Sequence, residues 1–131
     1  MDKKELINFA NIELFEKGNF EIISEIFATN YVVHSANKNY EGHDFIKKWF
    51  KQIHKTFSNI RVVKVEFFTE ENNSIVWQRT IKGKHINKIR GINPSGKNIK
   101  WNEIVVSRFD QNKIIEEWVV SELKGELLSK P

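Results

Sequence analysis

Two glutamates near the end of the chain could carry proton-transfer chemistry. Glu103 and Glu117 stand on the two sides of a predicted hairpin whose three-residue loop is 110–112. In that register Val105 faces Glu117 and Glu103 faces Val119, so the two carboxyl groups are diagonal neighbours on one face, about 7 Å apart at the backbone. Two carboxyl groups this close in a poorly hydrated pocket cannot both ionise easily. The one with the raised pKa could act as general base or acid near neutral pH.

The alternative for each glutamate is a structural one, in which a Lys or Arg pairs with it or water reaches it at the rim. His34 ends a short β-branched segment and could titrate or donate a hydrogen bond in the pocket, or serve as a structural histidine. Gln78 and Thr80 fall on the predicted inner face of a strand that follows an Asn-Asn turn. A buried amide or hydroxyl there must find a partner, either in the protein or in a ligand.

Aromatic side chains could supply the apolar wall of a pocket for a flat ligand. The candidates are Trp49, Phe57, Phe67 and Trp101, and core packing is their other possible role. His85 is predicted on the opposite face from Gln78, near a basic loop.

Four residues of the same predicted hairpin point to its other face. Arg108 and Glu116 are cross-strand neighbours there, flanked by Ile104 and Trp118. We interpret them as a structural ion pair and a dimer seam.

Several classes of site are not expected in this chain. It has no Cys, which excludes thiol nucleophiles, thiolate metal sites and disulfides and suits the cytoplasm. No two His stand at i, i+4 spacing with a carboxylate alongside, so no metal site is predicted. The first residues carry mixed charge, and nowhere do about 18 apolar residues follow one another, so we expect neither a signal peptide nor a membrane span.

The charge is mildly basic, with 21 Lys and Arg against 17 Asp and Glu. Positions 82–100 carry six cations and no acid. This stretch could be an ordinary solvated surface, could attract an anionic small molecule, or could touch nucleic acid. Because no aromatic residue interrupts it before Trp101, the nucleic-acid interpretation is the weakest, and we expect no nucleic-acid partner.

The elements that must position these residues follow from periodicity. Asp2 and Glu5 form a capping-box pattern, and a strongly amphipathic helix follows Gly42. The predicted helices are 3–17, a short one from Asn19, and 42–57; the predicted strands are 31–34, 61–69, 74–85, 101–109 and 113–121, with a helical turn in 121–128. This order predicts one α+β domain, 1–131, in which a curved antiparallel sheet packs on three N-terminal helices and can leave a pocket; the family resemblance described next implies that the sheet is cone-shaped.

The chain resembles the SnoaL-like polyketide or ester cyclase family, within the nuclear transport factor 2-like fold, over about residues 3 to 128. The residues that carry the resemblance are His34, Gly42, Phe57, Gly83-x-His85, Gly91-Ile92-x-Pro94-x-Gly96-Lys97, Trp101, Arg108-Phe109 and Lys113-Ile114-x-Glu116-x-Trp118. The resemblance implies a fold without cofactor or metal, often a homodimer through the outer sheet face, with a cavity between helices and sheet. The best-known members close a polyketide ring by an intramolecular aldol reaction with a carboxylate base.

One departure from the family pattern lies at the expected base. Cyclase members typically read Glu-His-Trp-Asp where this chain reads Glu116-Glu117-Trp118-Val119, so Val119 occupies the base position and is expected to line the pocket. The resulting hypothesis is a pocket for an apolar or ring-containing small molecule and proton abstraction beside a carbonyl. Glu117 would be the base, Glu103 its proton partner, and His34 with Gln78 would polarise the oxygen. The alternative is a noncatalytic ligand-binding or protein-interaction module.

Overall fold

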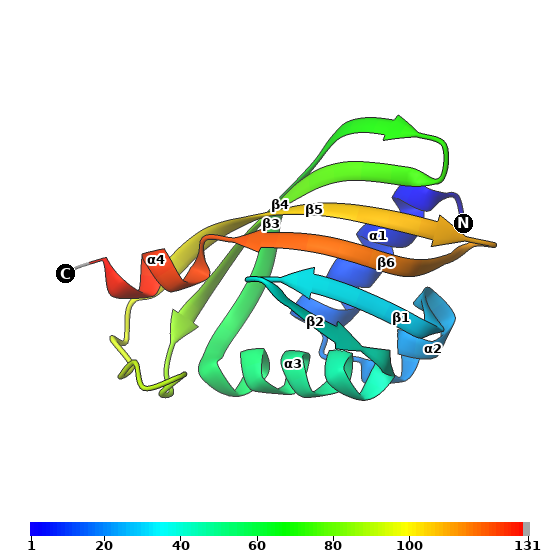
Figure 1. Cartoon of the computed structure of the whole chain (residues 1–131). Coiled ribbons are helices and arrows are strands. Elements are labelled where there is room, and N and C mark those ends of the chain that lie inside the picture. Colours follow the sequence, from blue (N-terminus) through cyan, green and yellow to red (C-terminus); the bar gives the residue numbers. More distant parts are fainter. Residues whose placement is uncertain (130–131) are drawn as a thin grey trace.

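The computed structural model describes residues 1–129 and shows one curved six-stranded sheet packed against helices (Figure 1). Along the sheet the strand order is β2-β1-β6-β5-β4-β3. The strands are β1 Phe27–Ser35, β2 Lys38–Glu41, β3 Phe57–Glu71, β4 Ser74–His85, β5 Asn98–Asp110 and β6 Lys113–Ser121. The helices are α1 Lys3–Asn11, extended by a π-helical turn Ile12–Glu16, then a 3₁₀ turn Phe20–Ile22, α2 Ile23–Ile26, α3 Gly42–Thr56 and α4 Leu123–Leu128. The predicted α+β class is confirmed.

The helices begin where the sequence predicts. The Asp2 side chain accepts from the Glu5 N–H at 2.8 Å, and the Glu5 side chain accepts from the Asp2 N–H at 3.0 Å, which completes a capping box. Helix α3 buries Ile46, Phe50 and Ile53 on one face, as its periodicity predicts. Among the described residues, no helix is long and apolar enough to cross a membrane.

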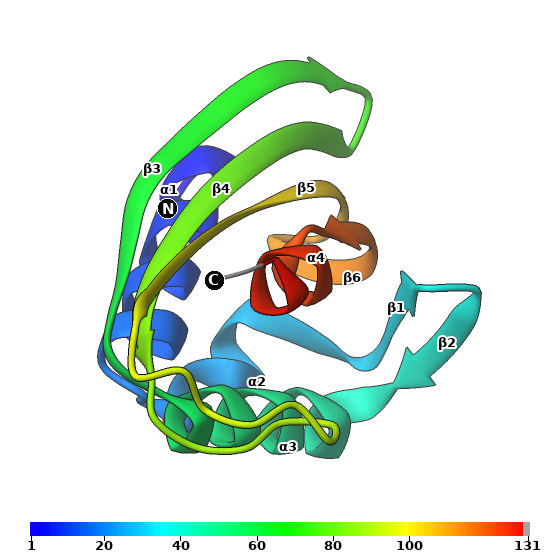
Figure 2. The same ribbon diagram turned by 90° about the vertical axis from the view of Figure 1, so that its left-hand side faces the viewer.

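Strand β3 is bent by bulges. It spans 15 residues against 12 in its partner β4, and the register shifts between Ser58 and Arg61, Val62 and Lys64, and Phe67 and Thr69. Each extra residue bends the strand and increases its twist. The sheet therefore curves around the helices instead of lying flat (Figure 2).

The bulge at Phe68 overturns the predicted faces of β4. Next to the Asn-Asn turn the pairing is as expected, with Glu71 opposite Ser74. Beyond the bulge Phe67 pairs with Trp77, whereas the register that starts at the Asn-Asn turn would pair it with Gln78 if there were no bulge. A one-residue slip moves every side chain to the other face. Odd-numbered residues of β4 therefore face the helices and Gln78 faces outward.

The β5–β6 hairpin keeps the predicted faces but not the predicted partners. Its loop has two residues, Gln111 and Asn112, both with positive φ, and Asp110 pairs with Lys113. A bulge at Ile115 then shifts the register, so that Ser107 faces Glu117. The observed register differs from the predicted one by two residues, and a shift of two preserves the side of the sheet.

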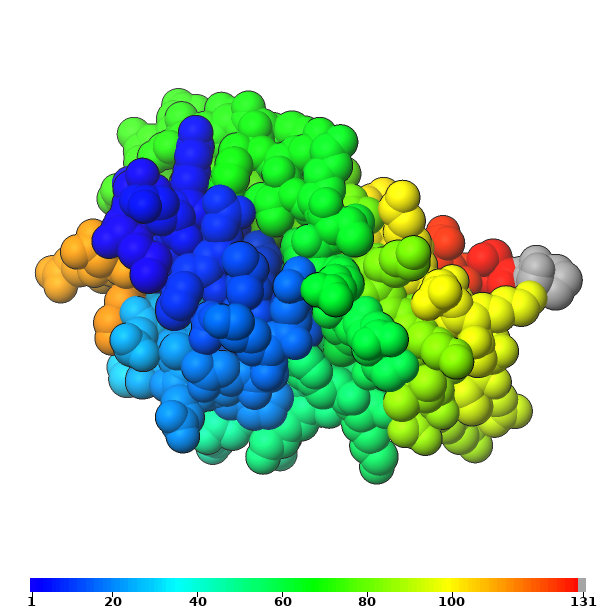
Figure 3. Space-filling view, turned by 180° about the vertical axis from the view of Figure 1, so that it is seen from behind, coloured from blue at the N-terminus to red at the C-terminus, as the bar shows by residue number. Residues whose placement is uncertain are grey.

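The sheet is mixed, which corrects the prediction that it is wholly antiparallel. Strand β1 pairs in parallel with β6, placing His34 beside Trp118. The short edge strand β2 was not predicted, because Lys38–Glu41 is mostly polar and exposed. The view from behind shows α1 on the near face of the molecule, next to β3 (Figure 3).

Candidate functional site

A cavity of about 920 Å³ lies between the sheet and the helices. Its inner part is lined mainly by apolar side chains of α1, β1, β4 and β6, including Ala10, Leu14, Phe27 and Ile114. Its other end is bounded by the β1–β2 turn, the segment 86–97 and α4, which stand at the same end of the molecule (Figures 1 and 2). The volume suits a small organic ligand with several rings.

Glu117 of β6 lines this cavity and is 8% exposed. One carboxylate oxygen accepts a hydrogen bond from the Tyr31 hydroxyl at 2.7 Å, and the other accepts from the Ser107 hydroxyl. Burial raises the pKa of the Glu117 carboxyl, while the Ser107 and Tyr31 hydroxyls and then the charge of Arg79 act in the opposite direction. A glutamate with a raised pKa can hold or release a proton nearer neutral pH than an exposed one.

The Ser107 hydroxyl is oriented by a tryptophan. Trp77 Nε1 donates to Ser107 Oγ at 2.9 Å, and the Ser107 hydroxyl donates onward to Glu117. Because an indole N–H can only donate, Ser107 must accept from Trp77 and keeps its own proton for the carboxylate. The two hydroxyl donors occupy two of the roughly four acceptor positions of an ionised carboxylate. Glu117 therefore retains capacity to accept a proton from a molecule in the cavity.

Glu103 also lines the cavity, but it is held in an ion pair. Its Oε1 lies 2.8 Å from Arg79 Nη2 and accepts from Arg79 Nε at 2.9 Å. Its Oε2 accepts from Trp101 Nε1 at 3.1 Å and from the Ser121 hydroxyl at 2.7 Å. This is the structural alternative considered for Glu103 from the sequence.

The two glutamates are farther apart than the sequence predicted. Glu103 pairs with Ser121 and Glu117 pairs with Ser107, so they stand four positions apart along the ladder. That spacing corresponds to about 13 Å of strand, whereas the predicted diagonal pair would be about 7 Å apart. The prediction that they share the inner face is confirmed, and the prediction that they are immediate neighbours is wrong.

Arg79 lines the cavity, although Gln78 and Thr80 were the residues of this strand predicted on the inner face. Its guanidinium carbon lies 4.6 Å from the centre of the Phe15 ring and 5.2 Å from that of Trp77, and Nη1 donates to Asn11 at 3.1 Å. The side chain is 14% exposed and lines the cavity. Correct pairing of Arg79 with Glu103 across β4 and β5 would have identified it, but the bulge at Phe68 concealed that register.

Gln78 and Thr80 do not line the cavity, contrary to prediction. Gln78 pairs with Ile104 of β5 on the outer face, and the Thr80 hydroxyl donates to Asn102 at 2.6 Å. The physical reason is the register slip at the bulge.

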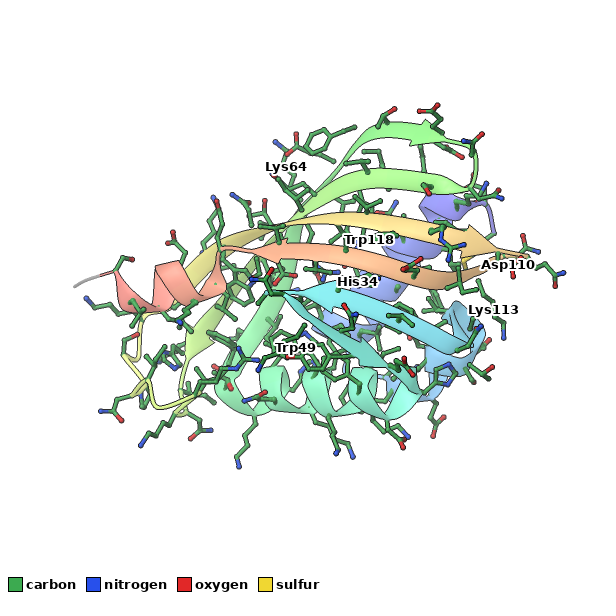
Figure 4. The ribbon with its side chains drawn as sticks, viewed as in Figure 1. His34, Trp49, Lys64, Asp110, Lys113 and Trp118 are labelled. Atoms are coloured by element: carbon green, nitrogen blue, oxygen red, sulfur yellow. The ribbon has the colours of Figure 1, made fainter. Side chains whose placement is uncertain are left out.

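His34 also lies outside the cavity. Its ring stacks on Trp118 with centroids 5.0 Å apart, and the two residues lie on neighbouring strands (Figure 4). Its ring nitrogens lie 2.6 Å from Glu116 and 2.6 Å from Asn39. The hydrogen bond to Glu116 and then the one to Asn39 raise the pKa of His34, and the bonds from His34 and then Arg108 lower the pKa of Glu116. The predicted ion pair of Arg108 and Glu116 is confirmed, at 2.7 Å.

The residues predicted to form an apolar wall have different surroundings. Trp49 of α3 and Val119 of β6 line the cavity, and Trp49 is visible between α3 and β2 (Figure 4). Phe57 and Trp101 pack on each other in the core, with ring centroids 5.0 Å apart. Phe67 packs at the margin of the core, beneath the Lys4 ammonium. The last three do not line the cavity.

His85 lies on the opposite face of β4 from Gln78, as predicted, but that face is the inner one. It is 1% exposed, packs against Phe57, and its Nε2 has no hydrogen-bond partner within residues 1–129. Within the same residues, no three His, Cys, Asp or Glu side chains are grouped so that they could hold a metal ion.

Comparison with known proteins connects this architecture to a family. The model of the SnoaL-like polyketide cyclase family matches residues 5–127. No curated protein matches the sequence. The structure of IdmH from Streptomyces antibioticus, a proposed polyketide cyclase, is similar with a TM-score of 0.81 and 17% identity, covering 97% of this chain and 96% of IdmH.

Two further structures show the same likeness. AclR from Streptomyces galilaeus, a proposed hydroxylase, has a TM-score of 0.77 and 20% identity, with 98% of this chain and 96% of AclR covered. A proposed polyketide cyclase from Acidithiobacillus ferrooxidans has a TM-score of 0.79 and 23% identity, with 94% of this chain and 89% of the cyclase covered. At these identities the structures establish a shared fold and leave the chemistry to the site. Since the family model spans most of the chain and the cone fold agrees with it, the protein belongs to the SnoaL-like polyketide cyclase family.

Proposed function

We propose that the protein is a cyclase or isomerase, working without a cofactor, that removes a proton beside a carbonyl group of an apolar, ring-containing small molecule. The observation that carries the proposal is Glu117: a buried carboxyl with a raised pKa, held by two hydroxyl groups and lining a largely apolar cavity. Family membership supports a small-molecule substrate, and a general base needs this combination of position and pKa.

The proposed reaction begins when Glu117 takes a proton from the carbon next to the carbonyl. The electron pair of the C–H bond moves to form an enolate, whose charge rests on the carbonyl oxygen. In a cyclase the enolate carbon then attacks a second carbonyl of the same molecule, and in an isomerase it takes back a proton at a different carbon. Glu117 returns its proton in either case, so the carboxylate is regenerated.

Arg79 is the proposed partner of the enolate oxygen. Its contacts to Glu103 and Asn11 use three of its five N–H groups. The guanidinium lines the cavity and is fixed between two aromatic rings. A preorganised cation in a poorly hydrated site stabilises developing negative charge strongly. Glu103 takes the role of a positioning residue for Arg79, in place of the predicted role of proton partner.

The test measures exchange of carbon-bound hydrogen in deuterated water, with β-tetralone as the ring-containing ketone probe. NMR would follow the loss of the proton beside the carbonyl. We expect the wild-type protein to accelerate exchange and Glu117→Gln to abolish the acceleration. Glu116→Gln is the matched control, because Glu116 is the neighbouring glutamate on the outer face, bonded to His34 and Arg108. Equal exchange by wild type and Glu117→Gln would remove Glu117 from the mechanism.

The predicted homodimer remains a proposal, supported by the outer face of the sheet. Trp118, Ile104 and Val120 are 40%, 44% and 70% exposed, and β5–β6 pairing places Ile104 opposite Val120. Adjacent apolar side chains on one sheet face are typical of an interface between subunits. Sedimentation equilibrium of the wild type should give twice the chain mass, and Ile104→Lys should shift it toward the monomer. A monomeric wild type would contradict the proposal.

A further inference from the structure

Three cationic side chains surround the end of the cavity that lies away from Glu117. Lys48 comes from α3, Arg90 from the loop after β4, and Lys124 from α4. All three are exposed, and none forms an ion pair in the part of the chain that the structure describes. Their charges are therefore available to a ligand.

The acids of the cavity do not neutralise this end. Glu103 and Glu117 are the acidic residues that line the cavity within residues 1–129, and both belong to its buried part. Glu103 is already paired with Arg79. The stretch 82–100, which contains Arg90, carries six cations and no acid. A concave site bordered by charges of one sign concentrates ligands of the opposite sign.

Arg90 is positioned more tightly than an ordinary surface arginine. Its guanidinium carbon lies 5.8 Å from the centre of the Trp49 ring, and Trp49 also lines the cavity. The backbone of Arg90 has φ of 46° in a tight turn closed by the bridge between Ile89 and Ile92. A left-handed conformation costs about 1–2 kcal/mol in a residue with a side chain, and Asn or Gly is usual there. The arginine thus occupies a position that its backbone conformation disfavours, directly over a cavity residue.

We propose that the substrate of this cavity is an anion: an apolar, ring-bearing molecule with a carboxylate or phosphate group that stays at the mouth between Arg90 and Lys48. The apolar body of the substrate fills the interior toward Glu117. Removing this apolar surface from water stabilises the complex by about 25 cal/mol per Å². The oxyanion stays where water and cations meet it, so it avoids the desolvation that a buried charge would suffer. The inference rests on the proposed function only in taking this cavity as the substrate site.

The test compares a carboxylate with an uncharged molecule of the same shape, pyrenebutyrate and pyrenebutyramide. Trp49 and Trp77 line the cavity, so energy transfer from tryptophan to pyrene reports binding. At low salt we expect pyrenebutyrate to bind about tenfold more tightly than pyrenebutyramide. Two partly screened ion pairs, with Arg90 and Lys48, account for a difference of this size. Pyrenebutyl phosphate, tested alongside, distinguishes a site that prefers phosphate from one that prefers carboxylate. The preference over the amide should shrink as salt is added.

The decisive variant is Lys48→Gln/Arg90→Gln, which should lose most of the preference for the anion over the amide, with the remainder due to Lys124. The control is Lys84→Gln/Lys97→Gln, which removes the same charge from the same basic end without touching the cavity lining. Equal binding of anion and amide by the wild type, no binding of either, or an equal loss in the control would overturn the proposal. Glu117→Gln should keep the preference for the anion. A failed exchange assay with that preference intact would therefore count against the proposed chemistry and not against the anion site.

Discussion

Removal of the Tyr31 hydroxyl should raise the pKa of Glu117. The hydroxyl donates to one carboxylate oxygen at 2.7 Å, and this bond lowers the pKa against the effect of burial. Tyr31→Phe should therefore raise the pKa of Glu117 further, because the ionised carboxylate loses a hydrogen bond that contributes about 1.5–3 kcal/mol.

The assay is an NMR titration of the glutamate carboxyl carbons in isotopically labelled protein. The Glu117 signal is assigned by its absence from Glu117→Gln. Tyr40→Phe is the matched control, because Tyr40 also lines the cavity but stacks on Phe45. The pH dependence of ketone exchange should move in the same direction. A pKa that stays unchanged or falls in Tyr31→Phe would refute the account of how Glu117 is tuned.

Three further outcomes are expected. Arg79→Met leaves Glu103 buried without its cation and should lower the free energy of unfolding by about 3–5 kcal/mol in urea denaturation, with part recovered by adding Glu103→Leu. The pKa of Glu117 is higher in the folded protein than in the unfolded chain. The protonated Glu117 therefore contributes its full stabilisation below its unfolded-state pKa, and this stabilisation is lost as pH rises through its folded-state pKa. Glu117→Gln should flatten the pH dependence of the melting temperature. A methyl group at Gly83 would stand 3.0 Å from Cβ of Phe57, so Gly83→Ala should cost about 1–3 kcal/mol by overpacking.

Each of these outcomes has a control or a contradicting result. Gly125→Ala adds a methyl group where nothing lies within 4 Å, so it should not destabilise the protein. An Arg79→Met variant as stable as the wild type would show that the buried ion pair is not required. A pH dependence of melting that is the same in Glu117→Gln and the wild type would assign that dependence to other groups.

Local patterns were sufficient to predict most of the elements. The capping box at Asp2, the amphipathic period after Gly42 and the alternation in β4 each depend on neighbours within a few residues. The inner face of β5 and β6 was also predictable, because an error of two residues in register leaves Glu103 and Glu117 on the same side.

The remaining features depend on irregular or distant pairing. The bulge at Phe68 has no sequence signal of its own, and it places Phe67 opposite Trp77 instead of Gln78, so Gln78 was assigned to the inner face in place of Trp77 and Arg79. His34 lies outside the cavity because side chains alternate along β1 and Tyr31 and Val33 take the inner face. Its place beside Trp118 follows from the parallel pairing of β1 with β6, and no local pattern specifies which strand lies beside another. Ser107 and Tyr31 were therefore missed as the residues that hold Glu117.

The strand order has a consequence for how the molecule assembles. β6 is the last strand along the chain, yet it joins β1 and β2 to the three strands on its other side. Tyr31 and Glu117, which meet in the cavity, are 86 positions apart. During synthesis β1 can pair with β2, but its other edge has no partner until β6 leaves the ribosome. Because contacts between such distant segments slow folding, the strand order predicts that the pocket around Glu117 forms late.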